Sequence, residues 1–328
     1  MTGMRTSALV AMLLVGSSWA AEPGQQSLAE GIVVIPGGFA PGHQPDGNTV
    51  VFQGSDGLVV FDTGRHPEHS QKILDFAARS GEPIVAVVNS HWHLDHVSGN
   101  PRLRAAYPAL TVYASPAIDE AMSGFLAESR KQALQFLEQP GDPAQQADVR
   151  ADIATIESGK AVYPDINITG PGERNLAGRA LRIGFETDTV TEGDVWLYDA
   201  ATKTLAAGDL VTLPVPFFDT ACPPRWNQAL ARLQAVDFKR LVPGHGPVMD
   251  RKTFGVYRLA FEKLVQCAAS KAEAAACREG WLADAAPLLH DDEQRKLAGM
   301  LLDYYLGVVL RDEKKQAGFC PADPPAEH

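Results

Sequence analysis

The chain has 328 residues and an acidic balance, with 29 Lys and Arg against 40 Asp and Glu and a formal net charge of −11. This charge argues against a nucleic-acid-binding protein, whose binding surface is basic, and against docking on anionic lipid through a polybasic face. Hydrophobic residues make up 45% and charged residues 21% of the chain. This balance excludes wholesale disorder and predicts a globular protein with a sizeable core.

The first twenty residues form a segment of their own. Arg5 is their only charged residue, an apolar run covers residues 8–15, and small residues stand at Ser18 and Ala20. This order predicts a secretory signal peptide over residues 1–20, cleaved after Ala20, and a periplasmic or secreted protein; an uncleaved anchor is the alternative. Because a span needs about 20 apolar residues, we expect no membrane span after cleavage.

The next part of the chain alternates short β-type runs with loops rich in Gly, Pro and Asp. The run over residues 84–88 is entirely apolar and lies between Pro83 and Asn89, which is typical of a strand buried on both faces. The predicted elements are strands over residues 32–35, 49–53, 58–61, 84–88 and 110–114, and a helix over residues 70–79.

A helical insertion is predicted over about residues 115–160. Apolar residues keep roughly helical spacing from Ile118 to Leu137, the stretch 140–143 (PGDP) breaks the pattern, and a second helix is expected over residues 144–158. We interpret this segment as a helical hairpin packed on the domain. A lid over a substrate pocket is the alternative.

The remainder predicts a second group of strands and then helices. Beyond Asp250 the pattern is helical to about Lys315, with breaks near Gly280 and Pro287. The alternation of strands and helices favours an α/β layered fold. The expected elements are strands over residues 180–185, 195–198, 204–207 and 241–242, and a helix over residues 226–236. The expected organisation is a signal peptide over 1–20, an α/β domain over 21–250 that contains the insertion, and a helical extension over 251–328 with a mobile tail.

Four cysteines are compatible with two disulfides in an exported protein. Three connectivities are possible. Cys267 and Cys277 lie ten residues apart in a helical stretch and can pin a turn between helices, which leaves Cys222 with Cys320. For Cys222 a bridge is favoured, with a sulfur ligand or nucleophile as the alternative.

The densest chemical signal is the stretch 91–96 (HWHLDH), directly after the buried strand. His91 and His93 lie two residues apart, so an extended chain turns both side chains to one side, while Asp95 and His96 follow at the turn. Imidazole and carboxylate ligands suit zinc. The end of a buried strand opens into the crevice where α/β folds bind ligands. The stretch therefore predicts a metal site.

This H-x-H-x-D-H pattern resembles the metallo-β-lactamase superfamily of metallohydrolases. Three further segments resemble family landmarks and follow in the family order: residues 61–64 (FDTG), 207–210 (AGDL) and 243–246 (PGHG). The resemblance implies a four-layer αβ/βα sandwich, in which two facing sheets carry helices on their outer sides. It also implies a metal site at one edge of the sandwich.

The resemblance implies a role for six residues. His91 and His93 would bind a first metal ion, and Asp95, His96 and His245 a second, with Asp209 bridging the two. The implied cofactor is zinc, as one or two ions, with iron as the alternative. Asp95 or Asp209 would orient a metal-bound hydroxide. For Asp209 the alternative is a turn residue, for His245 a solvated loop histidine, and Asp62 is interpreted as a structural hydrogen-bonding carboxylate rather than a ligand.

One position departs from the family pattern. Val190 stands where the family usually has a third histidine for the first metal ion, and valine cannot bind a metal. The first site is then empty, or Asp188, His43, His66 or His69 substitutes, or the fold has lost hydrolysis. We rank these outcomes in that order, because a catalytic zinc normally keeps three protein ligands.

These observations predict an exported metallohydrolase that acts on a small molecule. Its metal-bound hydroxide would attack an ester, thioester, lactam or related bond. The first alternative is an iron-dependent redox enzyme acting on a sulfur or oxygen substrate, because histidine and carboxylate ligands also suit iron. The second alternative is a non-catalytic exported binding or accessory protein that retains the fold. It is suggested by Val190, which cannot bind a metal.

Overall fold

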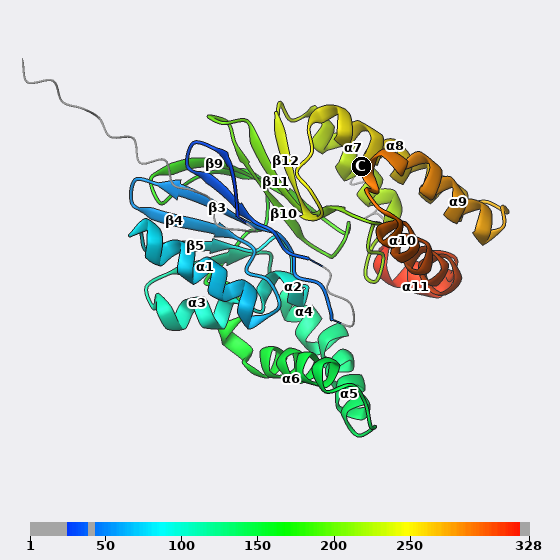
Figure 1. Ribbon diagram of the computed structural model, residues 1–328, viewed down its shortest axis with the longest axis horizontal. Helices are drawn as coiled ribbons and strands as arrows, with labels where there is room; N and C mark the ends of the chain where they lie inside the picture. Colours follow the sequence, from blue (N-terminus) through cyan, green and yellow to red (C-terminus); the bar gives the residue numbers. More distant parts are fainter. Residues whose placement is uncertain (1–24, 39–42, 322–328) are drawn as a thin grey trace, which may run out of the picture.

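The computed structural model describes residues 25–38 and 43–321, so the predicted signal peptide and its cleavage site lie outside the described residues. Two β-sheets face each other, and helices cover the outer side of each sheet (Figure 1). This is the four-layer αβ/βα sandwich that the family resemblance implies. No helix within the described ranges is long and apolar enough to cross a membrane.

The first sheet has seven strands that lie side by side in chain order. Strands β1 to β4 pair antiparallel and β4 to β7 pair parallel. The central strands β4 and β5 are almost wholly buried, which explains their unbroken apolar sequences. The strands are β1 (Gln26–Ala29), β2 (Ile32–Ile35), β3 (Thr49–Gly54), β4 (Gly57–Phe61), β5 (Ile84–Val88), β6 (Thr111–Ala114) and β7 (Ile166–Asn167).

The second sheet has five strands in the order β12-β11-β10-β9-β8. Its pairs are antiparallel except for β11 and β12, which run parallel and end at the same edge. Asp209 lies on β11 and His245 ends β12, so this pairing brings two distant parts of the sequence together. The strands are β8 (Gly172–Leu176), β9 (Arg179–Glu186), β10 (Asp194–Asp199), β11 (Thr204–Thr212) and β12 (Arg240–His245).

Three apolar clusters hold these layers together. One lies between the sheets and includes Phe52, Phe61 and Leu197. A second packs helices α1 (Pro67–Ser80) and α3 (Asn100–Ala106) on the first sheet. The third packs α7 (Pro223–Ala235) and the C-terminal helices on the second sheet. Burial of apolar surface on both sides of each sheet stabilises the sandwich and fixes its edges, where the candidate site lies.

The insertion between β6 and β7 consists of helices, as the sequence predicts. It contains α4 (Ile118–Ser123), α5 (Phe125–Leu137), α6 (Pro143–Glu157) and the short η1 (Gly159–Ala161). Asp142 caps α6 by accepting hydrogen bonds from the backbone N–H groups of Ala144 and Gln145. The helices project from one end of the sandwich (Figure 1). A small apolar cluster that includes Trp92, Ile118 and Leu126 attaches their base to the short helix α2 (Leu94–Val97).

The C-terminal part is helical and breaks near Pro287 as predicted, but the break predicted near Gly280 is wrong. Helix α9 runs through Gly280, and the chain instead turns between α8 and α9, where a disulfide joins Cys267 and Cys277. A second disulfide joins Cys222 to Cys320, so of the three possible connectivities the structure has the one in which Cys267 pairs with Cys277, and Cys222 is no free thiol. The elements are α8 (Arg251–Ala268), α9 (Ala274–Asp284), η2 (Ala286–Leu288), α10 (Asp292–Tyr304), η3 (Tyr305–Val309) and α11 (Glu313–Phe319).

Candidate metal centre

The predicted ligands come together at one edge of the sandwich. Strand β5 ends at Val88, the chain turns at residues 89–93, and α2 then carries Asp95 and His96. Parallel strands β11 and β12 bring Asp209 and His245 from the facing sheet to the same edge. Four of these six side chains belong to one group and three to another, with Asp209 common to both.

The four-residue group consists of Asp95, His96, Asp209 and His245, and all four residues are buried. One potential ligand atom from each lies within 4.8 Å of the others. The Nε2 atom of His96 lies 3.1 Å from Oδ1 of Asp209, and Nε2 of His245 lies 3.0 Å from Oδ2 of Asp95. Four buried nitrogen and carboxylate donors around one point match the ligand number and chemistry of a zinc site.

The three-residue group consists of His91, His93 and Asp209, whose candidate ligand atoms also lie within 4.8 Å of one another. The Nε2 atom of His91 lies 3.8 Å from Oδ2 of Asp209. This oxygen belongs to the same carboxylate that faces the four-residue group, so Asp209 lies between the two groups. The geometry matches the bridging position that the resemblance implies.

A buried network orients the imidazoles of His96 and His91. Asp62 accepts hydrogen bonds from the backbone N–H of Ser90 at 2.7 Å, from the Ser90 hydroxyl at 2.7 Å and from Nδ1 of His96 at 2.8 Å. Because the Ser90 hydroxyl donates to Asp62, its oxygen accepts from Nδ1 of His91 at 2.8 Å. Both histidines therefore present the lone pair of Nε2 to the site. Asp62 is the structural carboxylate that the sequence predicts.

His93 is oriented from the other side by Thr220. The Thr220 hydroxyl donates to the carbonyl oxygen of Val190 at 2.8 Å, so its oxygen accepts from Nε2 of His93 at 3.0 Å. The proton of His93 is then on Nε2, and its Nδ1 carries the lone pair. Thr220 thus acts on the three-residue group in the way that Asp62 acts on His96.

The buried polar atoms of the site are suited to a cation. Within the described chain, Nε2 of His91, Nε2 of His96 and both carboxylate oxygens of Asp209 are buried without a hydrogen-bond partner. The Nε2 lone pair of His96 faces an Asp209 oxygen, and two acceptors this close repel each other unless a proton or cation lies between them. The residues present therefore fit a divalent cation.

The pKa values follow from burial and from the neighbouring charges. Burial, assisted by the imidazoles of His96 and His93, holds the pKa of His91 well below its usual value. Burial also lowers the pKa of His93. Burial would lower the pKa of His96 too, but the carboxylates of Asp209, Asp62 and Asp95 outweigh it and raise that pKa well above the usual value. The same carboxylates attract a metal cation.

Two glycines allow the backbone to approach the site closely. A Cβ atom on Gly244 would lie 1.9 Å from Oδ1 of Asp209, and one on Gly47 would lie 2.5 Å from Cε1 of His96. Both distances are far below van der Waals contact, so any side chain at these positions displaces a candidate ligand. The stretch 243–246 therefore requires glycine at position 244 for steric reasons, in addition to the histidine at position 245.

Val190 lies buried in the apolar cluster of the second sheet, and its backbone N–H donates to Asp194 at 3.0 Å. The residues considered as its replacement lie elsewhere. Asp188 pairs with Arg225, and His69 bonds to Thr49 at 2.8 Å. His43 and His66 lie next to Asp148 of helix α6 and form a third group with it. Among the described residues, the three-residue group gains no ligand from these four.

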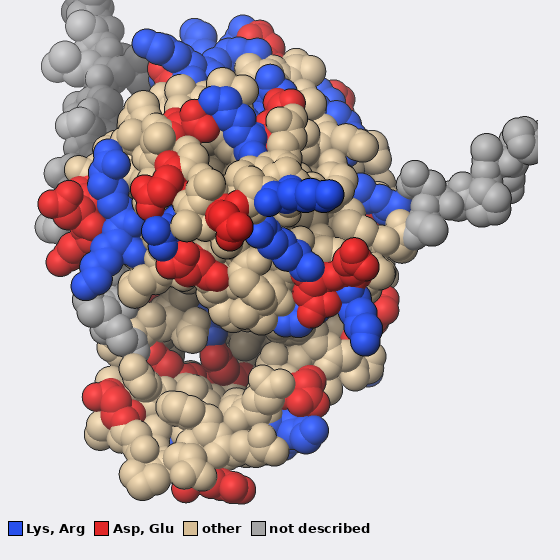
Figure 2. Space-filling view, turned by 90° about the vertical axis from the view of Figure 1, so that its right-hand side faces the viewer, with Lys and Arg blue, Asp and Glu red and all other residues tan. Residues whose placement is uncertain are grey.

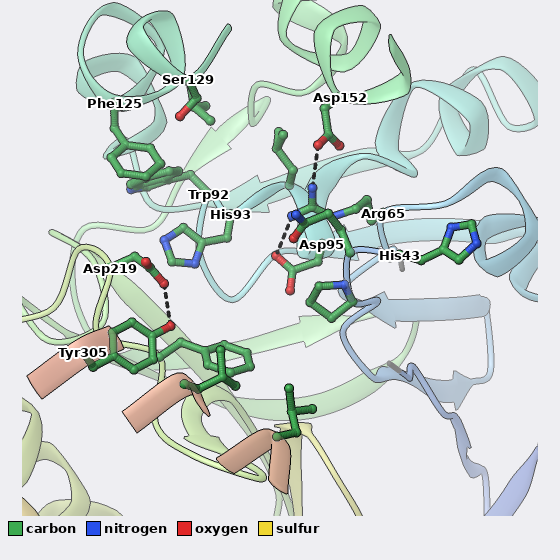
Figure 3. A pocket seen from close by; sticks show the side chains of 17 residues that line it. His43, Arg65, Trp92, His93, Asp95, Phe125, Ser129, Asp152, Asp219 and Tyr305 are labelled. Atoms are coloured by element: carbon green, nitrogen blue, oxygen red, sulfur yellow. Dashed lines mark hydrogen bonds and ion pairs between the residues drawn. The ribbon is translucent and has the colours of Figure 1, made fainter. Parts of the chain in front are cut away.

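A cavity of about 510 Å³ adjoins the candidate centre. His93 and Asp95 lie in its wall, with Trp92 and Phe125 beside them and Tyr305 opposite (Figure 3). The insertion and the C-terminal extension form two of its sides. The predicted insertion thus packs on the domain through its base and also lines a cavity.

The comparison with known families decides the classification. The model of the metallo-beta-lactamase superfamily matches residues 44–245, which is more than half of the chain. The chain belongs to the metallo-β-lactamase superfamily. The match includes all six predicted ligands, from His91 to His245. A solved structure, the metallo-beta-lactamase from Pontibacter korlensis, superposes with a TM-score of 0.52 at 19% identity, covering 70% of this chain and 94% of that one. At this identity the likeness concerns the fold alone.

Curated relatives match over short stretches only. A hydroxyacylglutathione hydrolase of Gloeobacter violaceus is 45% identical over 49 residues, which are 15% of this chain and 19% of the relative. A linear primary-alkylsulfatase of a Pseudomonas species is 38% identical over 50 residues, 15% of this chain and 10% of the relative. The chain therefore matches a fifth or less of the length of these relatives.

The sequence did not reveal the residues that orient the ligands from outside. Ser90 precedes the motif and Thr220 lies in the loop after β11, and neither belongs to a metal-binding pattern. Tyr305 reaches the cavity from the C-terminal extension, more than 200 residues after the motif. In the loop at residues 217–222 the sequence indicated a role for Cys222 alone.

Proposed function

We propose that this chain is an exported metal-dependent hydrolase that cleaves an ester, thioester, lactam or related bond in a small molecule. The observation that carries the proposal is the four-residue group, in which four buried ligand atoms lie within 4.8 Å of one another beside an open cavity. Hydrolase names among the partial relatives support it. The domain over residues 21–250 would hold the centre, and the extension over 251–328 would help to form the cavity.

The proposed ligands are His91, His93, Asp95, His96, Asp209 and His245, and the proposed ion is zinc. A bound zinc ion supplies Lewis acidity, which polarises a carbonyl oxygen and acidifies water to a pKa of about 7. The residues of the chain hold and orient the reactants. Asp95 or Asp209 would orient the attacking water, and the buried setting would strengthen their electrostatic effect.

We rank occupation by a single ion first. The four-residue group has four ligands, of which His96 is held by its hydrogen bond to Asp62, whereas the three-residue group shares Asp209 and has valine at the usual histidine position. Fewer ligands and a shared carboxylate lower its affinity. The four-residue group would then hold the ion of the isolated protein, and the three-residue group would fill only at higher zinc concentration.

The test is metal analysis of protein purified without added metal, followed by hydrolysis assays. We expect about one zinc per chain and turnover of at least one probe among a lactam, a thioester, a lactone and a phosphodiester. The Asp209→Asn variant should lose both metal and turnover, while Asp292→Asn, which removes an exposed carboxylate of α10, should retain them. Metal-loaded wild-type protein that is inert to all four probes would contradict the proposal.

An iron-dependent redox enzyme is the second candidate, because the same histidine and carboxylate ligands suit iron. Iron in the unsupplemented protein, together with oxygen uptake on a thiol or persulfide, would favour it over hydrolysis. A non-catalytic protein would be favoured if His91→Ala and Asp209→Ala changed neither the metal content nor the phenotype of the host.

Export is proposed from the N-terminal sequence and supported by the two disulfides. Disulfides persist in oxidising compartments such as the periplasm and the extracellular space. Fractionation of the native host, with N-terminal sequencing of the mature protein, tests the proposal. We expect the mature chain to begin at Ala21, and a cytoplasmic full-length chain would contradict it.

A further inference from the structure

The cavity beside the candidate centre has walls of unequal chemistry. Apolar side chains come from the insertion at Phe125 and Leu126 and from helix α10 at Leu297 and Leu301. Figure 2 shows a hollow between the insertion, at the bottom of the view, and the body of the molecule, with acidic side chains inside it. A ligand that fills this cavity buries an apolar group between the two helical regions.

The single cationic side chain among the described lining residues, apart from histidine, is already neutralised. Nη1 of Arg65 lies 2.7 Å from a carboxylate oxygen of Asp152, and its Nη2 lies 3.8 Å from Asp95 (Figure 3). Both carboxylates also line the cavity. An anionic group of a ligand would have to compete with them for the guanidinium, which weakens its binding.

Asp219 adds a carboxylate on the opposite wall. It lies next to His93 in the close view and accepts a hydrogen bond at 2.7 Å from the hydroxyl of Tyr305 (Figure 3). The tyrosine donates its only proton to Oδ2, and the carboxylate has further acceptor capacity through Oδ1. With Arg65 and Asp152 compensating each other, Asp219 gives the wall outside the candidate ligands a net negative charge.

One disulfide and one hydrogen bond hold this carboxylate in place. The loop that carries Asp219 is joined through Cys222 to Cys320, and Tyr305 comes from the same C-terminal region. Placing a charged acceptor at a fixed point of a cavity is what a specificity-determining residue requires. The C-terminal extension therefore shapes the cavity and also fixes its charge.

We propose that Asp219 is a specificity-determining residue that accepts an N–H donor, ammonium or neutral amide, from a substrate whose apolar part lies between Phe125 and Leu301. Substrates with a carboxylate at that point are disfavoured. The proposal rests on the proposed hydrolase function, because only an enzyme has a substrate. The recognition itself is a binding property that needs no turnover.

The test compares three probes that share a phenyl group and a four-carbon chain: 4-phenylbutylammonium, 4-phenylbutanamide and 4-phenylbutanoate. Calorimetry on the protein with its native metal content gives the dissociation constant of each. We expect the ammonium probe to bind about tenfold more tightly than the butanoate, with the amide between them, because hydrogen bonds to charged groups are the stronger ones. Ammonium binding that is no tighter in the wild type than in Asp219→Asn would overturn the proposal.

Variants assign the preference to Asp219. Asp219→Asn should reduce the ratio between ammonium and butanoate to near one, whereas Asp292→Asn, with the same change in net charge, should leave it unchanged. Tyr305→Phe retains the carboxylate but removes the hydrogen bond that holds it, so it should lower the ratio less than Asp219→Asn does. A bound metal ion can bind the butanoate carboxylate directly, so the ratio is compared between variants of equal metal content, in which the contribution of the ion is the same. A ratio that survives in Asp219→Asn would overturn the proposal.

The outcome is independent of the proposed function. Probe binding with the expected ratio and no hydrolysis of any test ester would retain Asp219 as a recognition residue while removing the hydrolase. Hydrolysis without the expected ratio would do the reverse. Circular dichroism and thermal unfolding of Asp219→Asn would show whether a changed ratio reflects the lost carboxylate or a lost fold.

Discussion

The two halves of the candidate centre share a carboxylate but differ in construction. The four-residue group draws two ligands from α2 and two from the edge of the second sheet, and Asp62 orients His96 from within the core. The three-residue group has two histidines from one short turn, and Thr220 of a loop orients His93. Ligands held by several rigid elements bind a metal more strongly than ligands from one turn. Val190, at the position where the resemblance implies a histidine, therefore concerns the half that has fewer supporting elements.

The largest effect is expected from the residue that both halves share. Asp209→Asn removes the bridging carboxylate charge, so we expect both groups to lose their metal affinity and turnover to fall to background. Metal content and hydrolysis rate are the measurements, with Asp292→Asn as the charge-matched control. Metal retained at the wild-type ratio would contradict this prediction, because Asp209 would then be a ligand in neither group.

The second effect concerns the hydrogen-bond network behind His96 and His91. Asp62→Asn weakens the hydrogen bond that orients His96, and second contacts of this kind are worth about 10–100-fold in metal affinity. We expect that loss for the first zinc equivalent in a competition titration with a chelator. Because Asp62 also fixes Ser90, which orients His91, unfolding should be measured in parallel. An unchanged first affinity would show that this network does not determine the affinity for the tightest ion.

The third experiment restores the residue that the family usually has. Val190→His supplies an imidazole at the position where the resemblance implies a third histidine, so we expect the metal-to-protein ratio to rise from about one towards two. Val190→Leu is the control for the changed volume in the apolar cluster. Stability should fall in the histidine variant, since a polar ring enters a buried apolar position. A ratio that stays at one would indicate that the backbone at position 190 holds side chains away from the site.

A smaller effect is expected from Thr220→Val. This change leaves Nε2 of His93 without its acceptor and releases the tautomer, so the affinity of the weaker half should fall by about tenfold. The first zinc equivalent should be unaffected, and Thr202→Val serves as a control threonine far from the motif in the sequence. A loss of the first equivalent would mean that the two halves are coupled more tightly than the shared carboxylate requires.

The last prediction concerns His69, which supports Asp62 through Thr49, and the pH dependence of the free energy of unfolding. Burial lowers the pKa of His69 to about 4, and its ring donates to Thr49, whose hydroxyl donates to the carbonyl of Asp62. The unfolded chain takes up this proton at about pH 6.5. Stability from the neutral ring is therefore present above pH 6.5 and lost as the pH falls towards 4, with a slope of at most about 1.4 kcal/mol per pH unit.

Urea unfolding between pH 4 and 7 measures that slope for the wild type and for His69→Gln, which has no proton to take up in this range. A smaller slope in the variant is the expected result. Equal slopes would show that other groups, such as the candidate ligands themselves, dominate the acid sensitivity.

The sequence predicts the strands and the cluster at residues 91–96 well because both follow local rules, whereas Asp209 and His245 were indicated by the family resemblance. The apolar run over residues 84–88 and the histidines at positions two apart depend only on neighbours in the chain. Thr220, Asp219 and Tyr305 depend on how the loop after β11 meets the C-terminal extension, and no periodic pattern encodes such a meeting. The break expected at Gly280 was wrong for the same reason: helix α9 packs against α8 and α10, and this tertiary packing outweighs the intrinsic cost of a glycine.

The bridge between Cys222 and Cys320 closes a covalent ring around the last third of the chain, with a sequence separation of 98 residues. A protease that nicks any exposed loop inside this ring, such as the turn before α9, releases no fragment while the bond is intact. Because Cys320 is bonded to Cys222, the end of α11 is held next to the loop that bears Asp219.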